Sequence, residues 1–328
     1  MTNAFDTEIN ILLSHLHDAD PGVRRIALIK LVDLEEEKAL PLLIDALGHD
    51  ADAAVRMEAA ALLEGWDDTT VVTALCSALT DPITDVRERA AHSLGELKNA
   101  RAGTILLDWV IHEDAFVRTA VWHALRELRL PEVVPQALNA LDDSDAGVRR
   151  EAVAVLGWLK HQPALPELAR RLRDDDDAGV RRAAAGALGL GDDDGTLAAL
   201  QMALHDPDWR VREEAANTLG KLRRRQAGPA LLAALDDNYW QVRLQAARAL
   251  GRLRYAAAVT TLTTLLNHAI GNLRKEVALA LGEMAGVPSA VSPARTALTV
   301  ALDDPDPEVR KAVRIALAQL ALSPDTRK

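Results

Sequence analysis

The sequence predicts an all-α fold, an α-solenoid in which about ten helical hairpins stack into one right-handed superhelix. A hydrophobic residue followed by an arginine recurs ten times along the 328 residues, at a spacing of 31 or 32 residues with one exception. A leucine follows each arginine seven residues later. No stretch alternates strictly enough, or carries enough aromatic and β-branched residues, to predict strands. The arginines are Arg24, Arg56, Arg87, Arg118, Arg149, Arg181, Arg212, Arg243, Arg274 and Arg310, and the leucines are Leu31, Leu63, Leu94, Leu125, Leu156, Leu188, Leu219, Leu250, Leu281 and Leu317.

Each repeat has the pattern of two helices. In the fifth repeat, Val148, Ala152 and Val155 fall at three- and four-residue steps, which places them on one face of the second helix. The first helices are less regular but visible, for example at 39–47, 71–79 and 227–235. We therefore expect one continuous domain over residues 1–328, without a single central core. The predicted repeats are 4–34, 35–66, 67–97, 98–128, 129–159, 160–191, 192–222, 223–253, 254–285 and 286–320.

Two aspartates precede most of the repeat arginines. The nearer one, four residues before the arginine, is expected to begin the second helix, because a short carboxylate can accept hydrogen bonds from free N–H groups. This aspartate recurs at Asp20, Asp52, Asp114, Asp145, Asp177, Asp208 and Asp306. The other, six residues before the arginine, recurs at Asp18, Asp50, Asp81, Asp143, Asp175, Asp206, Asp237 and Asp304. It predicts a ladder of carboxylates opposite a ladder of guanidiniums along the stack.

The last repeat, Asp-Pro-Asp-Pro-Glu-Val-Arg-Lys-Ala-Val-Arg-Ile-Ala-Leu at 304–317, resembles the HEAT repeats. Within them it is similar to the subgroup named for the phycobilisome (bilin) lyases. The resemblance covers nearly the whole chain, and it implies an α-solenoid whose second helices line a concave face. For the subgroup it implies chemistry on tetrapyrroles, their attachment or detachment.

The remaining composition narrows the cellular setting. No apolar run reaches the roughly 18 residues that a membrane-spanning helix needs, and residues 1–10 are too polar for a signal peptide. The single cysteine, Cys76, can form no internal disulfide. We therefore expect a cytoplasmic protein without a membrane partner. Between Arg274 and Arg310 the spacing grows to 36 residues, and two prolines and a glycine in residues 285–293 predict a loop there.

The charge is unevenly distributed. The whole chain carries a formal charge of −11, yet residues 209–275 contain twelve Lys and Arg against four acids, which leaves −19 for the remainder. Inward positions in this segment hold Lys221, Arg248 and Arg252, and Trp209, Tyr239 and Trp240 lie in the same two repeats. Guanidiniums beside flat aromatic faces suit an anionic ligand or a protein with an acidic surface. Nucleic acid is disfavoured because phosphate binding calls for a basic stripe along the whole groove.

A second constellation lies in the third and fourth repeats. His92 and His123 occupy equivalent positions, and Glu96 and Glu127 follow them by four residues, so each imidazole lies one turn from a carboxylate. These are suitable ligands for zinc, iron or manganese, and a hydrated polar strip is the alternative. HEAT-repeat hydroxylases with a diiron centre use His-Glu dipeptides in paired repeats, whereas this sequence has only one, at residues 112–113.

Signatures of common enzymes are missing. The sequence has no glycine-rich phosphate loop, no Cys-x-x-Cys and no serine in a nucleophile elbow. It therefore favours a non-catalytic scaffold or adaptor that binds another protein in its concave face and holds no cofactor. The alternative is a lyase, or an accessory or chaperone protein, that acts on a protein bearing a tetrapyrrole or a metal ion.

Overall fold

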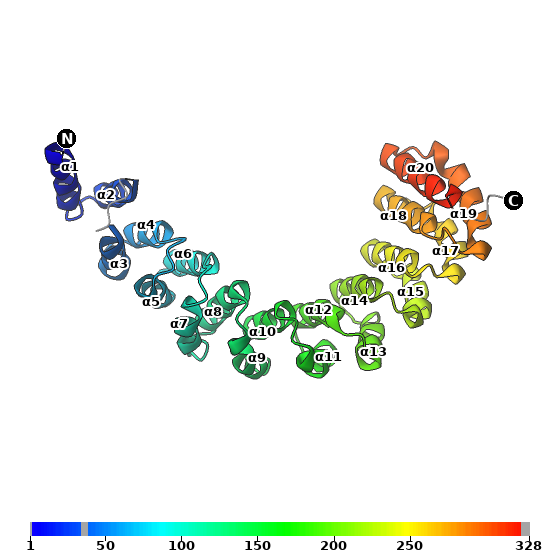
Figure 1. Cartoon of the computed structure of the whole chain (residues 1–328), viewed down its shortest axis with the longest axis horizontal. Helices are drawn as coiled ribbons and strands as arrows, with labels where there is room; N and C mark the ends of the chain where they lie inside the picture. The colour runs from blue at the N-terminus through cyan, green and yellow to red at the C-terminus, as the bar shows by residue number, and fades with distance from the viewer. Residues whose placement is uncertain (1, 34–38, 323–328) are drawn as a thin grey trace. The chain divides into compact units, whose positions relative to one another are not determined.

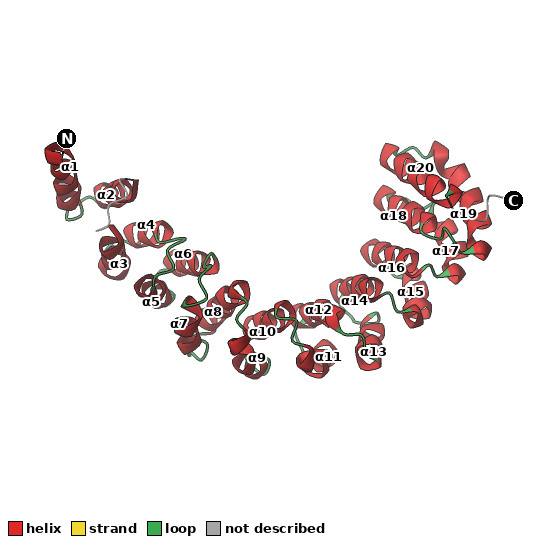
Figure 2. Cartoon of the chain, viewed as in Figure 1, coloured by secondary structure: helices red, strands yellow, loops and turns green. Residues whose placement is uncertain are grey.

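The computed structural model describes residues 2–33 and 39–322, and all regular structure in these ranges is helical (Figures 1 and 2). Twenty α-helices form ten consecutive hairpins, which confirms the all-α solenoid. The boundary predicted between residues 34 and 35 lies outside the described residues. The helices are α1 (Thr2–His15), α2 (Pro21–Asp33), α3 (Ala39–His49), α4 (Ala53–Leu62), α5 (Thr69–Ala78), α6 (Thr84–Gly95), α7 (Ala102–Trp109), α8 (Ala115–Leu128), α9 (Val134–Ala140), α10 (Ala146–Trp158), α11 (Leu165–Asp174), α12 (Ala178–Ala187), α13 (Asp194–Ala203), α14 (Trp209–Leu222), α15 (Gly228–Ala233), α16 (Trp240–Leu253), α17 (Val259–Leu265), α18 (Gly271–Gly282), α19 (Pro288–Val300) and α20 (Pro307–Ala321).

The chain divides into two compact units, Met1–Leu159 and Lys160–Lys328. In each unit the even-numbered helices form one layer and the odd-numbered helices form the other (Figure 1). Within the second unit the row of hairpins curves, and α12, α14, α16, α18 and α20 pack successively against one another on the inner side of the curve (Figure 1). We call this row the inner layer of the second unit. A single superhelix over the whole chain remains a prediction.

The predicted helix caps are confirmed. Asp52, for example, has an extended backbone, and its side chain accepts a hydrogen bond from the amide of Ala54. The same interaction begins the second helix of six other repeats, at Asp20, Asp114, Asp145, Asp177, Asp208 and Asp306. Each cap satisfies an amide that would otherwise lack an acceptor, and each therefore fixes where the helix begins.

The predicted ladder is also formed, and it joins neighbouring repeats. Arg56 Nε donates to Asp81 Oδ2 at 2.7 Å and Arg56 Nη2 donates to Asp81 Oδ1 at 2.9 Å. The third nitrogen, Nη1, donates to the carbonyl oxygen of Asp50 at 2.9 Å, so one guanidinium holds its own turn and the next repeat together. We call this the Arg–Asp ladder. Its other pairs are Arg24–Asp50 and Arg118–Asp143 in the first unit and Arg181–Asp206, Arg212–Asp237 and Arg274–Asp304 in the second.

Histidine replaces the ladder aspartate in two repeats. His268 Nδ1 lies 3.1 Å from the amide nitrogen of Ile270 and accepts its proton, as the aspartates do in other repeats. It offers no carboxylate to Arg243, however, and Arg243 makes no ion pair among the described residues. The ladder is therefore interrupted between the eighth and ninth repeats.

The core lies between the two layers and between successive repeats. The repeat leucines form much of it, and Leu156 is fully buried. Glycine lets the inner helices approach backbone to backbone, since a Cβ on Gly251 would lie 2.8 Å from Cα of Ala280. A methyl group does not fit at that distance, which explains the glycine despite its cost to helix propensity of about 1 kcal/mol.

The loop predicted at residues 285–293 is wrong over most of its length. Helix α19 begins at Pro288, where a missing N–H costs nothing, and it continues through Pro293. Ala290, Ala294 and Leu298 lie four residues apart and are buried on one face. Packing of this face therefore outweighs the hydrogen bond that Pro293 removes, and the turn shrinks to residues 283–287.

Candidate functional site

Five of the six predicted binding residues lie at the two ends of neighbouring inner helices, and Arg248 lies in the middle of α16. Trp209 is the first residue of α14 and Lys221 lies close to its end, whereas Trp240 and Arg252 take the equivalent places in α16. Twelve residues separate the members of each pair, which corresponds to about 18 Å along a helix. The structure therefore divides the predicted set into an aromatic group and a cationic group.

The aromatic end consists of Trp209, Tyr239 and Trp240. The ring of Trp209 stacks on Tyr239 of the next repeat, with ring centroids 5.4 Å apart and an interplanar angle of 9°. Arg212, which forms a ladder pair with Asp237 at 2.7 Å, lies over the Tyr239 ring at 5.6 Å. The partner of Trp209 across the repeat boundary is thus a tyrosine. The stack links two repeats and still leaves Tyr239 exposed.

The predicted cations differ in how they are paired. Arg248 forms two bonds to Glu276 of α18, with Nε to Oε2 at 3.0 Å and Nη2 to Oε1 at 2.9 Å, so its charge is compensated within the protein. Lys221 Nζ lies 3.9 Å from Glu214, and half of its side chain is exposed. Arg252 makes no ion pair with any described residue, and its Nη1 lies 3.6 Å from the place that a Cβ on Gly220 would take. The guanidinium of Arg252 therefore reaches α14 at Gly220, the residue before Lys221.

Three further cations extend this group. Arg223, Arg225 and Arg254 are exposed, and none of them forms an ion pair in the part of the chain that the structure describes. We call Lys221, Arg223, Arg225, Arg252 and Arg254 the cationic end. Their neighbour Arg224 differs, because it binds the Asp194 carboxylate at 2.6 Å and the carbonyl oxygen of Asp192. The charge count of the sequence indicated these residues but could not tell a paired cation from an unpaired one.

The histidines and glutamates of the first unit do not converge on one point. His92 Nε2 lies 3.7 Å from Glu64, and His123 Nδ1 lies 3.6 Å from Glu151, so each imidazole faces a carboxylate of a neighbouring repeat. Glu96 lies 3.7 Å from Lys98, and Glu127 pairs with Arg126 at 3.1 Å. Among the described residues, no three His, Cys, Asp or Glu side chains gather as a metal site would require. The polar-strip interpretation agrees with this geometry.

Glu151 is the one largely buried acid of that strip. Burial opposes its ionisation, but the hydrogen bond with His123 and the charge of Arg126 outweigh burial and hold the pKa of Glu151 below its ordinary value. Arg126 Nη1 lies 3.0 Å from its Oε2. A paired carboxylate that is ionised at neutral pH is suited to holding α8 against α10 and unsuited to proton transfer near neutral pH.

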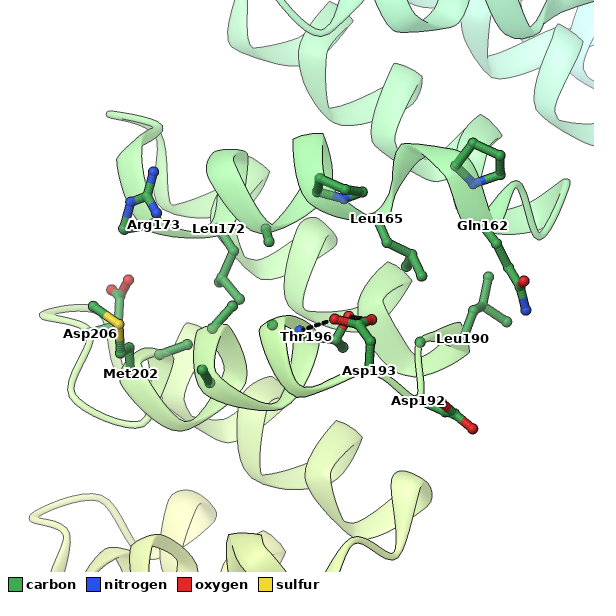
Figure 3. A pocket seen from close by; sticks show the side chains of 18 of the residues that line it. Gln162, Leu165, Leu172, Arg173, Leu190, Asp192, Asp193, Thr196, Met202 and Asp206 are labelled. Carbon is green, nitrogen blue, oxygen red and sulfur yellow. Dashed lines mark hydrogen bonds between the residues drawn. The ribbon is translucent and has the colours of Figure 1, made fainter.

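The outer layer of the second unit contains an apolar groove between α11 and α13, with a volume of about 1130 Å³ (Figure 3). Leu165 and Leu172 line one side, and Ala198 and Met202 line the other. The Asp193 carboxylate at one end accepts hydrogen bonds from the amide and hydroxyl of Thr196, which keep its pKa low and make it a helix cap. The groove has room for an apolar ligand.

A family model for HEAT repeats matches residues 6–64, 49–126, 110–189, 175–246 and 228–318, which together span nearly the whole chain. The chain belongs to the HEAT-repeat family. A search of curated proteins gives no match to this HEAT-repeat chain. Within its described residues, none of its helices combines the length and the apolar character needed to cross a bilayer.

Solved structures resemble the HEAT-repeat chain in fold. Yeast importin-β (Kap95p) gives a TM-score of 0.68 at 15% identity, over 98% of this chain and 51% of Kap95p. YibA of Escherichia coli gives 0.58 at 20% identity, over 76% of this chain and 92% of YibA. An engineered protein gives 0.52 at 20% identity, over 96% and 99% of the two chains. Kap95p has also been solved in complex with Nup1, and another structure concerns its binding to RanGDP.

Proposed function

We propose that this protein is a non-catalytic interaction scaffold, and that the inner layer of its second unit binds another protein with an acidic surface at α14 and α16. One observation carries the proposal: six arginines of the Arg–Asp ladder are paired with aspartates, whereas Arg252, Arg223 and Arg254 in these two repeats form no ion pair among the described residues. Lys221 is weakly paired at 3.9 Å. Cations that lie close together and form no ion pair within the protein are available to bind an anionic ligand.

Two further observations support a protein as the partner. The Kap95p solenoid, which is similar in fold, binds proteins, and this analogy favours the same general use here. The aromatic end supplies an exposed tyrosine and two tryptophans, the residue types that contribute most to protein interfaces. The formal charge of −11 for the whole chain argues against a long nucleic-acid partner.

We also place the protein in the cytoplasm. Its one cysteine, Cys76, is buried in the first unit, and burial raises the pKa of the Cys76 thiol to about 12. Such a thiol is unreactive and needs no oxidising compartment. The lyase alternative rests on the resemblance of the repeat at 304–317. A visible absorption band in the purified protein would favour it, and a colourless protein would favour the scaffold.

The experiment that tests the scaffold is capture of a partner, identified by mass spectrometry, followed by titration with the isolated partner. We expect affinity to fall as the salt concentration rises from 50 to 500 mM, because screening weakens attraction between exposed charges. Trp240→Ala should weaken binding without changing the melting temperature. A partner whose affinity is independent of both salt and Trp240 would refute docking at α14 and α16.

A further inference from the structure

We infer that the partner binds to the cationic end through a short, extended, acidic segment of its own. This segment crosses from α14 to α16. This inference rests on the proposed function and deepens it, because it names the place and the form of the partner. It separates the cationic end from the aromatic end, which lies about 18 Å away along the same helices.

Close packing of the inner helices brings like charges together at this place. A Cβ on Gly220 would lie 3.0 Å from Cα of Ala249, so α14 and α16 touch through their backbones. The next residue of α14 is Lys221, and the guanidinium of Arg252 lies over Gly220. Lys221 Nζ has only a distant carboxylate, Glu214 at 3.9 Å, and Arg252 forms no ion pair among the described residues. Their repulsion is unfavourable in the free protein, and a bound carboxylate would relieve it.

The backbone of two members is held in a conformation that favours glycine. Arg223 and Arg254 end α14 and α16 with φ of 54° and 48°, in the left-handed region. Glycine is the usual residue at this position of a helix, because it avoids the clash of Cβ with the backbone. A cation near a helix C-terminus is favourable, but that explains the charge and leaves the choice of arginine over glycine unexplained.

A comparison within the chain shows what such an arginine does elsewhere. Arg129 of the first unit has the same conformation, with φ of 53°, and its guanidinium lies over the ring of Trp158 at 4.5 Å. Its side chain therefore has a contact within its own unit. Arg223 and Arg254 are exposed and have no ring or ion-pair contact among the described residues, although Arg254 Nη1 lies 3.9 Å from the place that a Cβ on Gly286 would take. Lys160 has the same conformation, with φ of 52°, and also forms no ion pair among the described residues. The inference therefore rests on the grouping of Arg223 and Arg254 with Lys221 and Arg252, and not on the backbone conformation alone.

The surroundings limit the size of the partner segment. Asp194 lies on one side, bound to Arg224, and on the other side Glu283, the residue that follows α18, takes the position equivalent to Arg252. Neighbouring helices are about 10 Å apart, and the cationic end covers two of them, a distance of about 10–20 Å. Three to six extended residues cover that distance at about 3.4 Å each. A nucleic-acid duplex would continue past these cations onto acidic surface.

The test uses the full chain and a fluorescein-labelled peptide of ten glutamates, measured by anisotropy at 50 mM salt. Lys221→Glu/Arg252→Glu is compared with Lys311→Glu/Arg314→Glu, because the latter changes charge equally at exposed cations of α20 in the same unit. We expect the first variant to weaken peptide binding by about tenfold or more and the control by about twofold or less.

A second variant, Arg223→Gly/Arg254→Gly, tests the left-handed arginines. It should melt at or above the wild-type temperature, because glycine suits the conformation, and it should bind the peptide several-fold more weakly. If both cationic-end variants bound the peptide as tightly as the wild type, the cationic end would not be the binding site, and the proposal of an acidic partner would still stand. No binding of the peptide by the wild type would overturn the acidic partner itself. If a ten-nucleotide thymidine oligomer bound the wild type more tightly than the peptide does, and the same variants lost this binding, the partner would be a nucleic acid and not a protein segment.

Discussion

Removing one carboxylate from the Arg–Asp ladder should loosen the first unit measurably. In Asp81→Asn the amide can still accept one hydrogen bond from Arg56, but the charge and the two-point geometry at 2.7 and 2.9 Å are lost. The side chains of this pair are only 12% and 8% exposed, so water replaces little of the lost interaction. Hydrogen bonds to charged groups contribute about 1.5–3 kcal/mol each, and we expect a loss of about 2–3 kcal/mol in the free energy of unfolding.

The assay is urea denaturation followed by circular dichroism, with hydrogen exchange to locate the effect. Because repeats contact only their neighbours, protection should fall chiefly in α4 to α6. Asp108→Asn is the control, since Asp108 is exposed and bonded to none of the described side chains, and it should change stability by about 0.5 kcal/mol or less. If Asp81→Asn unfolded at the same urea concentration as the control, the ladder would have no part in holding the repeats together.

Three further predictions concern the same architecture. His268→Asp should supply the carboxylate that Arg243 lacks and stabilise the second unit by about 1 kcal/mol. The melting temperature should then rise by roughly 2–4 °C. An unchanged melting temperature would refute the interpretation that His268 interrupts the Arg–Asp ladder. Leu156→Ala should cost about 2–5 kcal/mol, because the side chain is fully buried. A denaturation midpoint equal to that of the wild type would show that Leu156 was wrongly assigned to the core. Hydrogen bonds from Arg24 lower the pKa of Asp50; burial opposes ionisation of Asp81, but the hydrogen bonds from Arg56 outweigh it and lower the pKa of Asp81. Their stabilisation is therefore complete above the unfolded value of about 3.9 and is lost as pH falls through the lower folded values; acid unfolding unaffected by Asp50→Asn would contradict this.

Much of the fold could be predicted from the sequence because its determinants are local and repeated. Arginine, aspartate and leucine at fixed spacing specified the caps, the ladder and the core, since each acts on the next repeat in the same way. The helix through Pro293 was missed because packing of Ala290 and Leu298 outweighs a local signal against helix.

The candidate site was predicted less completely, for two physical reasons. Spacing places a side chain on a face but does not show its partner, and so Arg248 could not be recognised as bound to Glu276. The left-handed conformation of Arg223 was equally hidden, because glycine is the residue that normally indicates it. The stack of Trp209 on Tyr239 depends on the register between two repeats, which neither repeat shows alone.

The central claim is that ladder cations hold the repeats together whereas the cationic end is kept for a partner. The most direct measurement is the melting temperature, without any ligand, of Arg212→Gln beside that of Lys221→Gln/Arg252→Gln. Arg212→Gln breaks the pair with Asp237 and should lower the melting temperature by several degrees, whereas the double variant removes like-charge repulsion and should melt at or above wild type. A fall in the double variant as large as that of Arg212→Gln would show that Lys221 and Arg252 stabilise the stack, and would contradict the claim.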